Sequence, residues 1–256
     1  GAVWGIPFAA SSVLGVDPRA PEETTRVGIV ASPEQVGGAS SAPSAVSSPY
    51  AQSWHGGLCC GVTGDVFGFP AAADAVLRVA PPHVPTTTTG DGDDDDAGGQ
   101  PVLASLLRVP GARGRYQWGG GAQCPATGII YGIPSDAPDV LRIDPRSGRV
   151  DRFGAEVVRR AGAAKNKWQN AVRGADGALY CVPCDADAVL RIDPATDALR
   201  LVGAGVIPPG KDKWQGAFTV DDGATIYAVP ESAEAVLRID VATHSVALLG
   251  LSTSSS

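Results

Sequence analysis

Four tryptophans in this sequence stand beside amide and cationic side chains in a recurring arrangement. An aromatic ring with such neighbours can stack on a sugar or anchor a peptide. We therefore predict that this group forms a surface for a ligand or a partner. The alternative is that each Trp wedges between repeats and holds the fold together, which would explain why every complete repeat has one. The candidate residues are Trp54, Trp118, Trp168, Trp214, Gln117, Gln169, Gln215, Lys167 and Lys213.

The other residues that could do chemistry do not form a recognisable set. Cys181 and Cys184 make a lone CxxC pair, whereas redox or zinc chemistry needs a helix N-terminus or a second ligand pair. The acidic run from Asp91 to Asp96 lacks the spacing of a calcium loop, so we interpret it as a solvated acidic segment. The three histidines are scattered along the chain. We therefore predict no catalytic residues, no metal site and no cofactor.

The Trp residues belong to a unit that occurs five times. Each copy contains a four-residue step: an aromatic residue, then any residue, then Val, Ile or Phe, and finally Pro. In the four copies after the first, a further Trp lies 15 or 16 residues before that Pro, and the copies repeat every 47 to 64 residues. Such self-similarity indicates a repeat architecture. The five steps are Trp4–Pro7, Phe67–Pro70, Tyr131–Pro134, Tyr180–Pro183 and Tyr227–Pro230.

Each unit reads as four short strands. In the last copy, GAFTV follows the Trp, an Asp-Gly turn leads to TIYAV, and a Pro ends that strand. AVLRI and SVALLG then follow as the third and fourth strands, and no copy shows helical periodicity. Four antiparallel strands repeated at this interval are typical of a β-propeller blade. Glycines in the first strand suit the innermost position, where backbones converge on the axis.

We predict one all-β domain over residues 1–256, a β-propeller with four-stranded antiparallel blades and an incomplete first blade. Gly1 aligns with a turn glycine of the other copies, so the first unit lacks its Trp and innermost strand. We expect the ring to close poorly there, or the natural chain to extend further N-terminally. The blades are approximately 1–30, 54–110, 117–154, 167–203 and 213–250, and low-complexity insertions occupy 31–53 and 82–100.

The repeat is similar to known propeller families. VLRIDPATDALRLVG (189–203), with strands such as TIYAV, resembles the YVTN-type repeat and, more loosely, NHL-type and virginiamycin-lyase-like propellers. The Trp-opened unit also resembles five-bladed tachylectin-type lectins. This resemblance implies the fold but not an activity, because these families share strands and differ in function. None of their catalytic residues maps onto this chain, so no site is carried over.

The predicted topology gathers the loops that flank the Trp residues on one face. The short Asp-Gly and Asp-Pro turns lie on the opposite face. A ring of Trp, Gln and Lys near the axis is therefore the predicted partner surface. Its loops are 53–55, 115–118, 165–169 and 211–215, beside loops 8–12, 71–75, 135–139, 184–188 and 231–235.

Charge and unit similarity rank the functions. The net charge is −7, five of which lie in the acidic run, so there is no basic footprint for nucleic acid. No apolar run approaches the roughly 18 residues of a membrane helix. The favoured function is a non-catalytic binding or scaffold module that holds a protein partner within a larger assembly. The alternatives are a lectin with repeated glycan sites and a lyase or lactonase-type enzyme. Near-equal units favour the first, because an enzyme usually has one blade with added polar residues at the axis.

Overall fold

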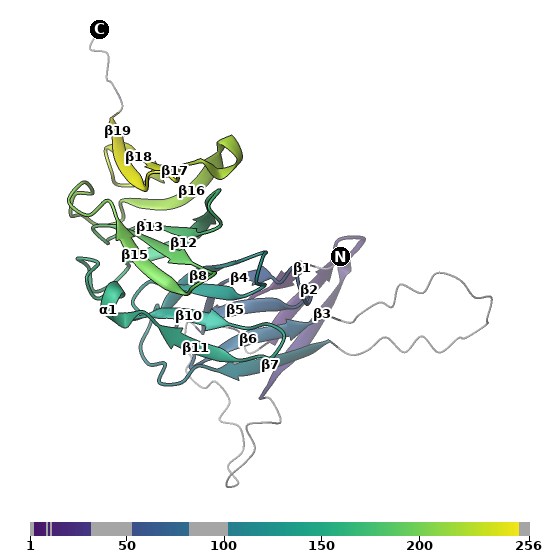
Figure 1. Cartoon of the computed structure of the whole chain (residues 1–256). Helices are drawn as coiled ribbons and strands as arrows, with labels where there is room; N and C mark the ends of the chain where they lie inside the picture. Colours follow the sequence, from purple (N-terminus) through teal and green to yellow (C-terminus); the bar gives the residue numbers. More distant parts are fainter. Residues whose placement is uncertain (1–2, 9, 11, 32–52, 82–101, 251–256) are drawn as a thin grey trace, which may run out of the picture.

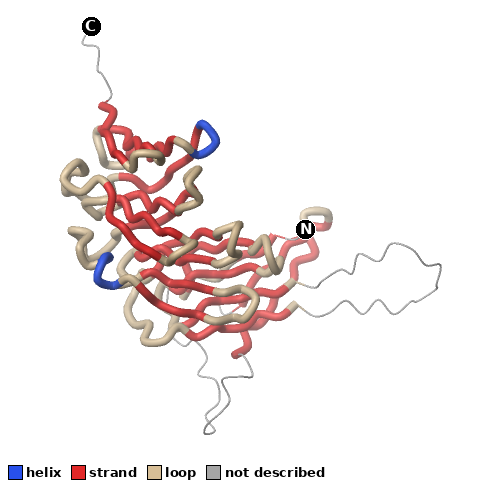
Figure 2. The backbone as a smooth tube through the Cα atoms, viewed as in Figure 1, coloured by secondary structure: helices blue, strands red, loops and turns tan. Residues whose placement is uncertain are grey.

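The computed structural model describes residues 3–8, 10, 12–31, 53–81 and 102–250, and nearly all of its elements are β-strands. Figure 1 shows the strands gathered into successive blades in chain order, with the first and last blades at opposite ends of an arc. Figure 2 shows how little of the described backbone is helical. The predicted all-β propeller architecture is therefore confirmed. The predicted insertions fall largely on residues outside the described ranges.

The third, fourth and fifth blades are separate four-stranded antiparallel sheets, and their strands follow chain order. Each begins at the repeat Trp. Their strands are β8 (Trp118–Gln123), β9 (Ile130–Pro134), β10 (Val140–Ile143), β11 (Val150–Phe153), β12 (Trp168–Arg173), β13 (Leu179–Pro183), β14 (Val189–Asp193), β15 (Ala198–Val202), β16 (Trp214–Val220), β17 (Thr225–Pro230), β18 (Ala235–Asp240) and β19 (Ser245–Gly250).

The first two blades share one seven-stranded sheet. The first blade has three described strands, which agrees with the predicted incomplete blade, and its last strand pairs in parallel with the last strand of the second blade. The sequence did not predict this pairing. It arises because β3 is twelve residues long and extends past its own blade. The strands are β1 (Val3–Gly5), β2 (Ser12–Asp17), β3 (Ala20–Ala31), β4 (Trp54–Cys59), β5 (Val66–Pro70), β6 (Ala75–Ala80) and β7 (Leu103–Arg108).

Within the described ranges, two helical turns occur in the connections. The helix α1 (Ala155–Val158) lies between the third and fourth blades, and the 3-10 turn η2 (Asp221–Gly223) joins β16 to β17. Neither is long enough to produce a helical period in the sequence. Among the described residues, no helix has the length and apolar character needed to cross a membrane.

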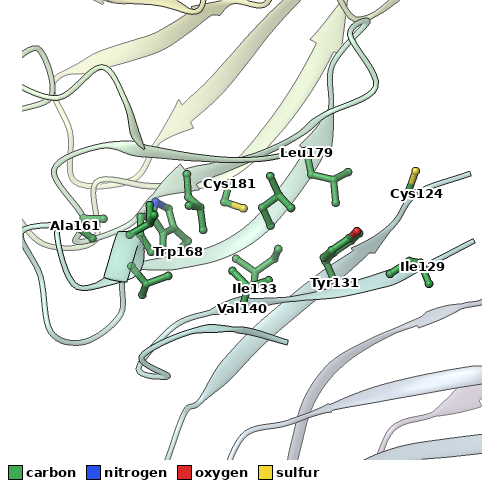
Figure 3. Close-up of a cluster of buried hydrophobic side chains, with 14 residues drawn as sticks. Cys124, Ile129, Tyr131, Ile133, Val140, Ala161, Trp168, Leu179 and Cys181 are labelled. Atoms are coloured by element: carbon green, nitrogen blue, oxygen red, sulfur yellow. The ribbon is translucent and has the colours of Figure 1, made fainter. Parts of the chain in front are cut away.

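Neighbouring blades pack through a repeated fit of a large side chain onto small ones. Phe69, the residue before the Pro of the second blade, lies over Gly121 and Gly132 of the third, which are directly paired across two strands. A Cβ on Gly121 would overlap the Phe69 ring, so this close approach requires glycine. Ile133 occupies the same position in the third blade, and Figure 3 shows it beside Cys181 of the fourth.

Candidate functional site

The inner ends of the second to fifth blades surround a cavity of about 530 Å³, which we call the axial pocket. The first strands of these blades, β4, β8, β12 and β16, contact one another in turn and so lie innermost. The pocket is formed by these strands and by loops of the predicted partner face. Its lining residues are His55, Tyr116, Trp118, Gly119, Ser135, Asp136, Lys165, Asn166, Gln169 and Gln215.

One position of the repeat supplies a lining residue from each of four blades. It is the residue immediately after the Trp, within the register shift that interrupts the pairing of the first two strands of each blade. The Trp side chains are buried, whereas the residues after them line the pocket. The four lining residues at this position are His55, Gly119, Gln169 and Gln215.

The four repeat indoles are buried, each with at most 1% of its surface exposed. Each Nε1–H donates to a backbone carbonyl of its own blade, at 2.8 Å for Trp54 to Ala75 and 2.9 Å for Trp168 to Ala188. Trp118 and Trp214 make the equivalent bonds. Each indole also packs in the apolar cluster shared with the preceding blade. These contacts hold blades together and leave no indole face for a ligand to stack on.

The polar residue before each of the last three repeat Trp residues is also buried, and its side chain is bonded to backbone carbonyls. Gln117 Nε2 lies 3.2 Å from the Ala73 carbonyl, and Lys167 Nζ lies 2.6 Å from the Ser135 carbonyl, in each case on the preceding blade. Lys213 Nζ donates to Gly210 at 3.0 Å. Burial lowers the pKa of Lys167 to about 8, against the opposing effect of nearby carboxylates, and lowers the pKa of Lys213 as well.

The nine predicted residues therefore divide into two groups. Trp118, Gln169 and Gln215 line the axial pocket, although the indole of Trp118 is itself fully buried. The remaining six lie in the packed interfaces between adjacent blades, which we call seams, or against backbone carbonyls. These six are Trp54, Trp168, Trp214, Gln117, Lys167 and Lys213.

Asn166 organises one wall of the pocket. Its backbone N–H donates to the Asp136 carboxylate at 2.8 Å, and its side-chain oxygen accepts from Gln169 Nε2. Its Nδ2 lies 2.8 Å from Asp212 Oδ1 and 3.2 Å from Asp185 Oδ1. The backbone is left-handed, with φ at 49°, a conformation that Asn adopts more readily than most residues. These bonds fix where the Gln169 amide stands.

Cys184, Asp185 and Asp212 place their ligand atoms within 4.8 Å of one another, as a metal site would require. The Asn166 amide nitrogen, however, lies against all three of these side chains. Burial, followed by the neighbouring carboxylates, raises the pKa of Cys184 to about 12, so the thiol is protonated at neutral pH. A thiol is a poor ligand compared with a thiolate. Cys181 and Cys184 are both free, and the run Asp91–Asp96 lies outside the described residues.

His55 is a pocket residue that lies in the predicted loop 53–55 but was not among the nine candidate residues. Its Nδ1 lies 2.7 Å from the Gly119 carbonyl, which can only accept, so Nδ1 carries the hydrogen. In the neutral ring, Nε2 is then left as an acceptor. The ring stacks edge-on against Phe8. The available signal was its place directly after Trp54, the position that Gln169 and Gln215 occupy in later blades.

Comparisons with known proteins define the class of fold. No family model matches the sequence, and no curated protein matches it. Virginiamycin B lyase from Staphylococcus aureus matches in two solved structures, with TM-scores of 0.60 and 0.62 and 15% and 14% identity, over 99% and 100% of this chain. An auxiliary nutrient binding protein from Bacteroides ovatus matches with a TM-score of 0.51 and 13% identity over 96% of the chain.

These matches show that the chain has a propeller fold resembling virginiamycin-lyase-like proteins. The chain spans about two thirds of the lyase length (68%) and about half of the nutrient binding protein (53%). At such low identity the likeness concerns the fold, because unrelated functions share propeller architectures.

Proposed function

We propose that this chain is a non-catalytic β-propeller binding module whose axial pocket holds a segment of a protein partner within a larger assembly. The observation that carries the proposal is the convergence of His55, Gly119, Gln169 and Gln215 on one pocket from four blades. Because His, Gly and two Gln residues meet there, the pocket presents one composite surface. That surface suits a single asymmetric ligand.

The chemistry of the lining suits a polypeptide. Gln169, Gln215 and Asn166 bring amides, which both donate and accept hydrogen bonds as a peptide backbone requires. Tyr116 stands at the pocket with 45% of its surface exposed, and exposed tyrosine is a common contact residue in protein interfaces. Lys165 and Asp136 add one charge of each sign.

A lectin with repeated glycan sites receives less support. Such a site would need an aromatic face in each repeat for sugar stacking, but the four repeat indoles are buried. The pocket residues at the one equivalent position are His, Gly, Gln and Gln, so the four blades do not repeat one contact. A glycan would therefore have to bind as a single ligand on the axis.

The test is partner recovery from an extract of the source cells. The purified chain is used as bait, beside a Gln169→Ala/Gln215→Ala variant and a Thr219→Ala control. Thr219 lines a separate hollow of about 430 Å³ at the turn end of the last two blades. We expect one protein to be recovered by wild type and control and at least about tenfold less by the double variant, a loss of about 1.4 kcal/mol. Equal recovery by all three chains would contradict the proposal.

A lyase-type activity is the second candidate, and His55 is the observation that favours it. His55 lines the pocket, its Nδ1–H is bound to the Gly119 carbonyl, and its Nε2 is left as an acceptor; general bases are most often histidines. One solved S. aureus virginiamycin B lyase is a catalytically inactive H270A form with quinupristin. Incubation of this chain with quinupristin, followed by mass spectrometry, discriminates the two functions. The binding proposal predicts no turnover. Turnover that His55→Ala abolishes would establish the enzyme instead.

A further inference from the structure

One wall of the axial pocket carries polar groups that have no bonding partner within the described part of the chain. Ser135 lines the pocket although only 3% of the residue is exposed, and no described residue bonds to its hydroxyl. The Tyr116 hydroxyl and the Lys165 ammonium line the pocket in the same unbonded state. All three groups can donate hydrogen bonds. This wall, which we call the donor wall, is therefore suited to a ligand group that accepts them.

Hydrogen bonds between neighbouring loops bring the donor wall together. The Asp136 N–H donates to the Tyr116 carbonyl at 2.9 Å, which places Ser135, the residue before Asp136, near Tyr116. The Asn166 N–H donates to the Asp136 carboxylate at 2.8 Å, which brings in Lys165, the residue before Asn166. The second of these bonds crosses the seam between the third and fourth blades. Loops of two blades therefore supply the three donors.

The charges around the donor wall leave a positive excess. Among the described residues, Asp136 is the one carboxylate in the pocket lining. Burial lowers the pKa of Lys167 to about 8 and the Asp136 charge opposes this, so the two charges act on each other, and Lys167 is mostly protonated at neutral pH. Lys167 therefore offsets Asp136, and the Lys165 ammonium is left uncompensated. Arg115 adds a further cation beside the wall, 5.8 Å from the centre of the Tyr116 ring.

Two more carboxylates lie behind Asn166 and outside the pocket lining. Asp212 and Asp185 accept from Asn166 Nδ2 at 2.8 Å and 3.2 Å. The charge of Asp185 also acts on the Lys213 ammonium, because it opposes the lowering of the Lys213 pKa by burial. The Asn166 amide therefore stands between these carboxylates and a ligand, and Lys213 offsets part of their charge.

We propose that the donor wall binds a carboxylate of the ligand in the axial pocket, with Lys165 as the counter-charge and the Ser135 and Tyr116 hydroxyls as donors. The carboxylate comes from an Asp or Glu side chain or from the C-terminus of a polypeptide, since both offer the same acceptor oxygens. Hydrogen bonds to an ionised group are stronger than neutral ones, so this contact would orient the ligand. Gln169 and Gln215 would then bind its backbone. This inference rests on the proposed function and adds the chemical class of one ligand group.

Affinity selection of short peptides on the immobilised full chain tests the inference. Four pools of random hexapeptides are offered, with a free or an amidated C-terminus and with or without Asp and Glu. Mass spectrometry identifies the retained peptides. We expect retention from pools that carry a carboxylate and none from the amidated pool that lacks Asp and Glu. Retention from the free-acid pool without Asp and Glu assigns the C-terminus, and retention from the amidated pool with Asp and Glu assigns a side chain.

Calorimetric titration of variants with a retained peptide then assigns the carboxylate to the donor wall. Lys165→Gln should weaken binding at least about fivefold, and added salt should weaken binding by wild type. Ser135→Ala should weaken it by about two- to tenfold. Lys211→Gln is the matched control and should bind as wild type, because Lys211 is the repeat equivalent of Lys165, is exposed and lies outside the pocket lining.

The outcomes separate this inference from the proposed function. Equal retention from all four pools would overturn the carboxylate contact and leave the pocket as the binding site. The same holds if Lys165→Gln binds as wild type while Gln169→Ala/Gln215→Ala has lost binding. Wild-type binding by all of these variants would overturn both proposals. Retention from none of the pools would overturn the inference, and partner recovery from the extract then decides the proposed function separately.

Discussion

Trp168 and Gln169 are neighbours in the sequence but lie in two different regions of the molecule. The Trp168 indole is buried in the seam between the third and fourth blades and donates to the Ala188 carbonyl. The Gln169 side chain stands in the axial pocket. The same division occurs at Trp54 and His55 in the second blade.

The seams and the axial pocket differ in how similar their residues are at equivalent positions of the repeat. The seams carry the same kind of residue in every blade, because each blade must pack on the next with the same geometry. The pocket position carries His, Gly, Gln and Gln in the second to fifth blades, so it is less uniform than the Trp position. The difference teaches that, in this molecule, the residues that recur hold the blades together. The candidate ligand contacts are those that vary between otherwise similar units.

The largest effect on stability should follow from removing a large buried side chain from a seam between two blades. Trp168→Ala removes a fully buried indole and leaves the Ala188 carbonyl without its donor. We expect a loss of about 3–5 kcal/mol in the free energy of unfolding, measured by urea denaturation. Tyr116→Ala removes an aromatic ring from the pocket and should cost about 1 kcal/mol or less. Similar losses for the two variants would break the distinction between the regions.

A second effect concerns the close approach of blades. Gly121→Val would push against Phe69, so we expect a loss of about 1–3 kcal/mol from overpacking. Gly216→Val is the matched control, because no atom lies within 4 Å of a Cβ built on Gly216 in the first strand of the last blade. Thermal unfolding should show a lower midpoint for the first variant and a nearly unchanged one for the second. A midpoint for Gly121→Val equal to wild type would contradict the packing account.

The buried ammonium of Lys167 predicts a pH dependence. Its pKa falls from 10.5 to about 8 on folding because burial disfavours the charged form. Between these values the unfolded chain binds more protons than the folded chain, so raising the pH stabilises the fold. The stability of wild type relative to Lys167→Met should therefore rise between pH 8 and 10, by at most about 1.4 kcal/mol per pH unit. A difference independent of pH would contradict the buried, titrating lysine.

The smallest effect on stability should come from the pocket itself. Gln215 is exposed and makes no side-chain hydrogen bond within the described part of the chain, so Gln215→Ala should change the unfolding free energy by about 0.5 kcal/mol or less. Partner recovery should nevertheless fall. A large loss of stability would place Gln215 with the seam residues and remove it from the proposed site.

Much of the fold could be predicted because local chemistry repeats with the chain. The spacing from Trp to Pro and the Asp-Gly turns located the strands. The sequence did not separate the buried Trp and Lys residues from the Gln residues that line the pocket, because Trp and Lys combine an apolar body with a polar tip and suit either place. Lys167 illustrates this, since its charged end is bound by the Ser135 carbonyl inside the fold.

Other features depend on contacts between distant residues. The parallel pairing of Ile29–Ala31 with Ala104–Leu106 joins two blades across a long sequence separation, and no periodicity signals it. The Gly119 carbonyl that orients His55 belongs to the next blade. Such contacts follow from how the blades are placed around the axis, which a single sequence does not specify.

The central claim is that the partner binds in the axial pocket, and site-specific photocrosslinking tests it most directly. A photoreactive phenylalanine analogue is introduced at position 215 in the pocket and, as control, at exposed Thr219 at the turn end of the same strand. The account predicts one protein adduct from position 215 in an extract of the source cells, and none from position 219. The same adduct from both positions, or an adduct from position 219 alone, would contradict it.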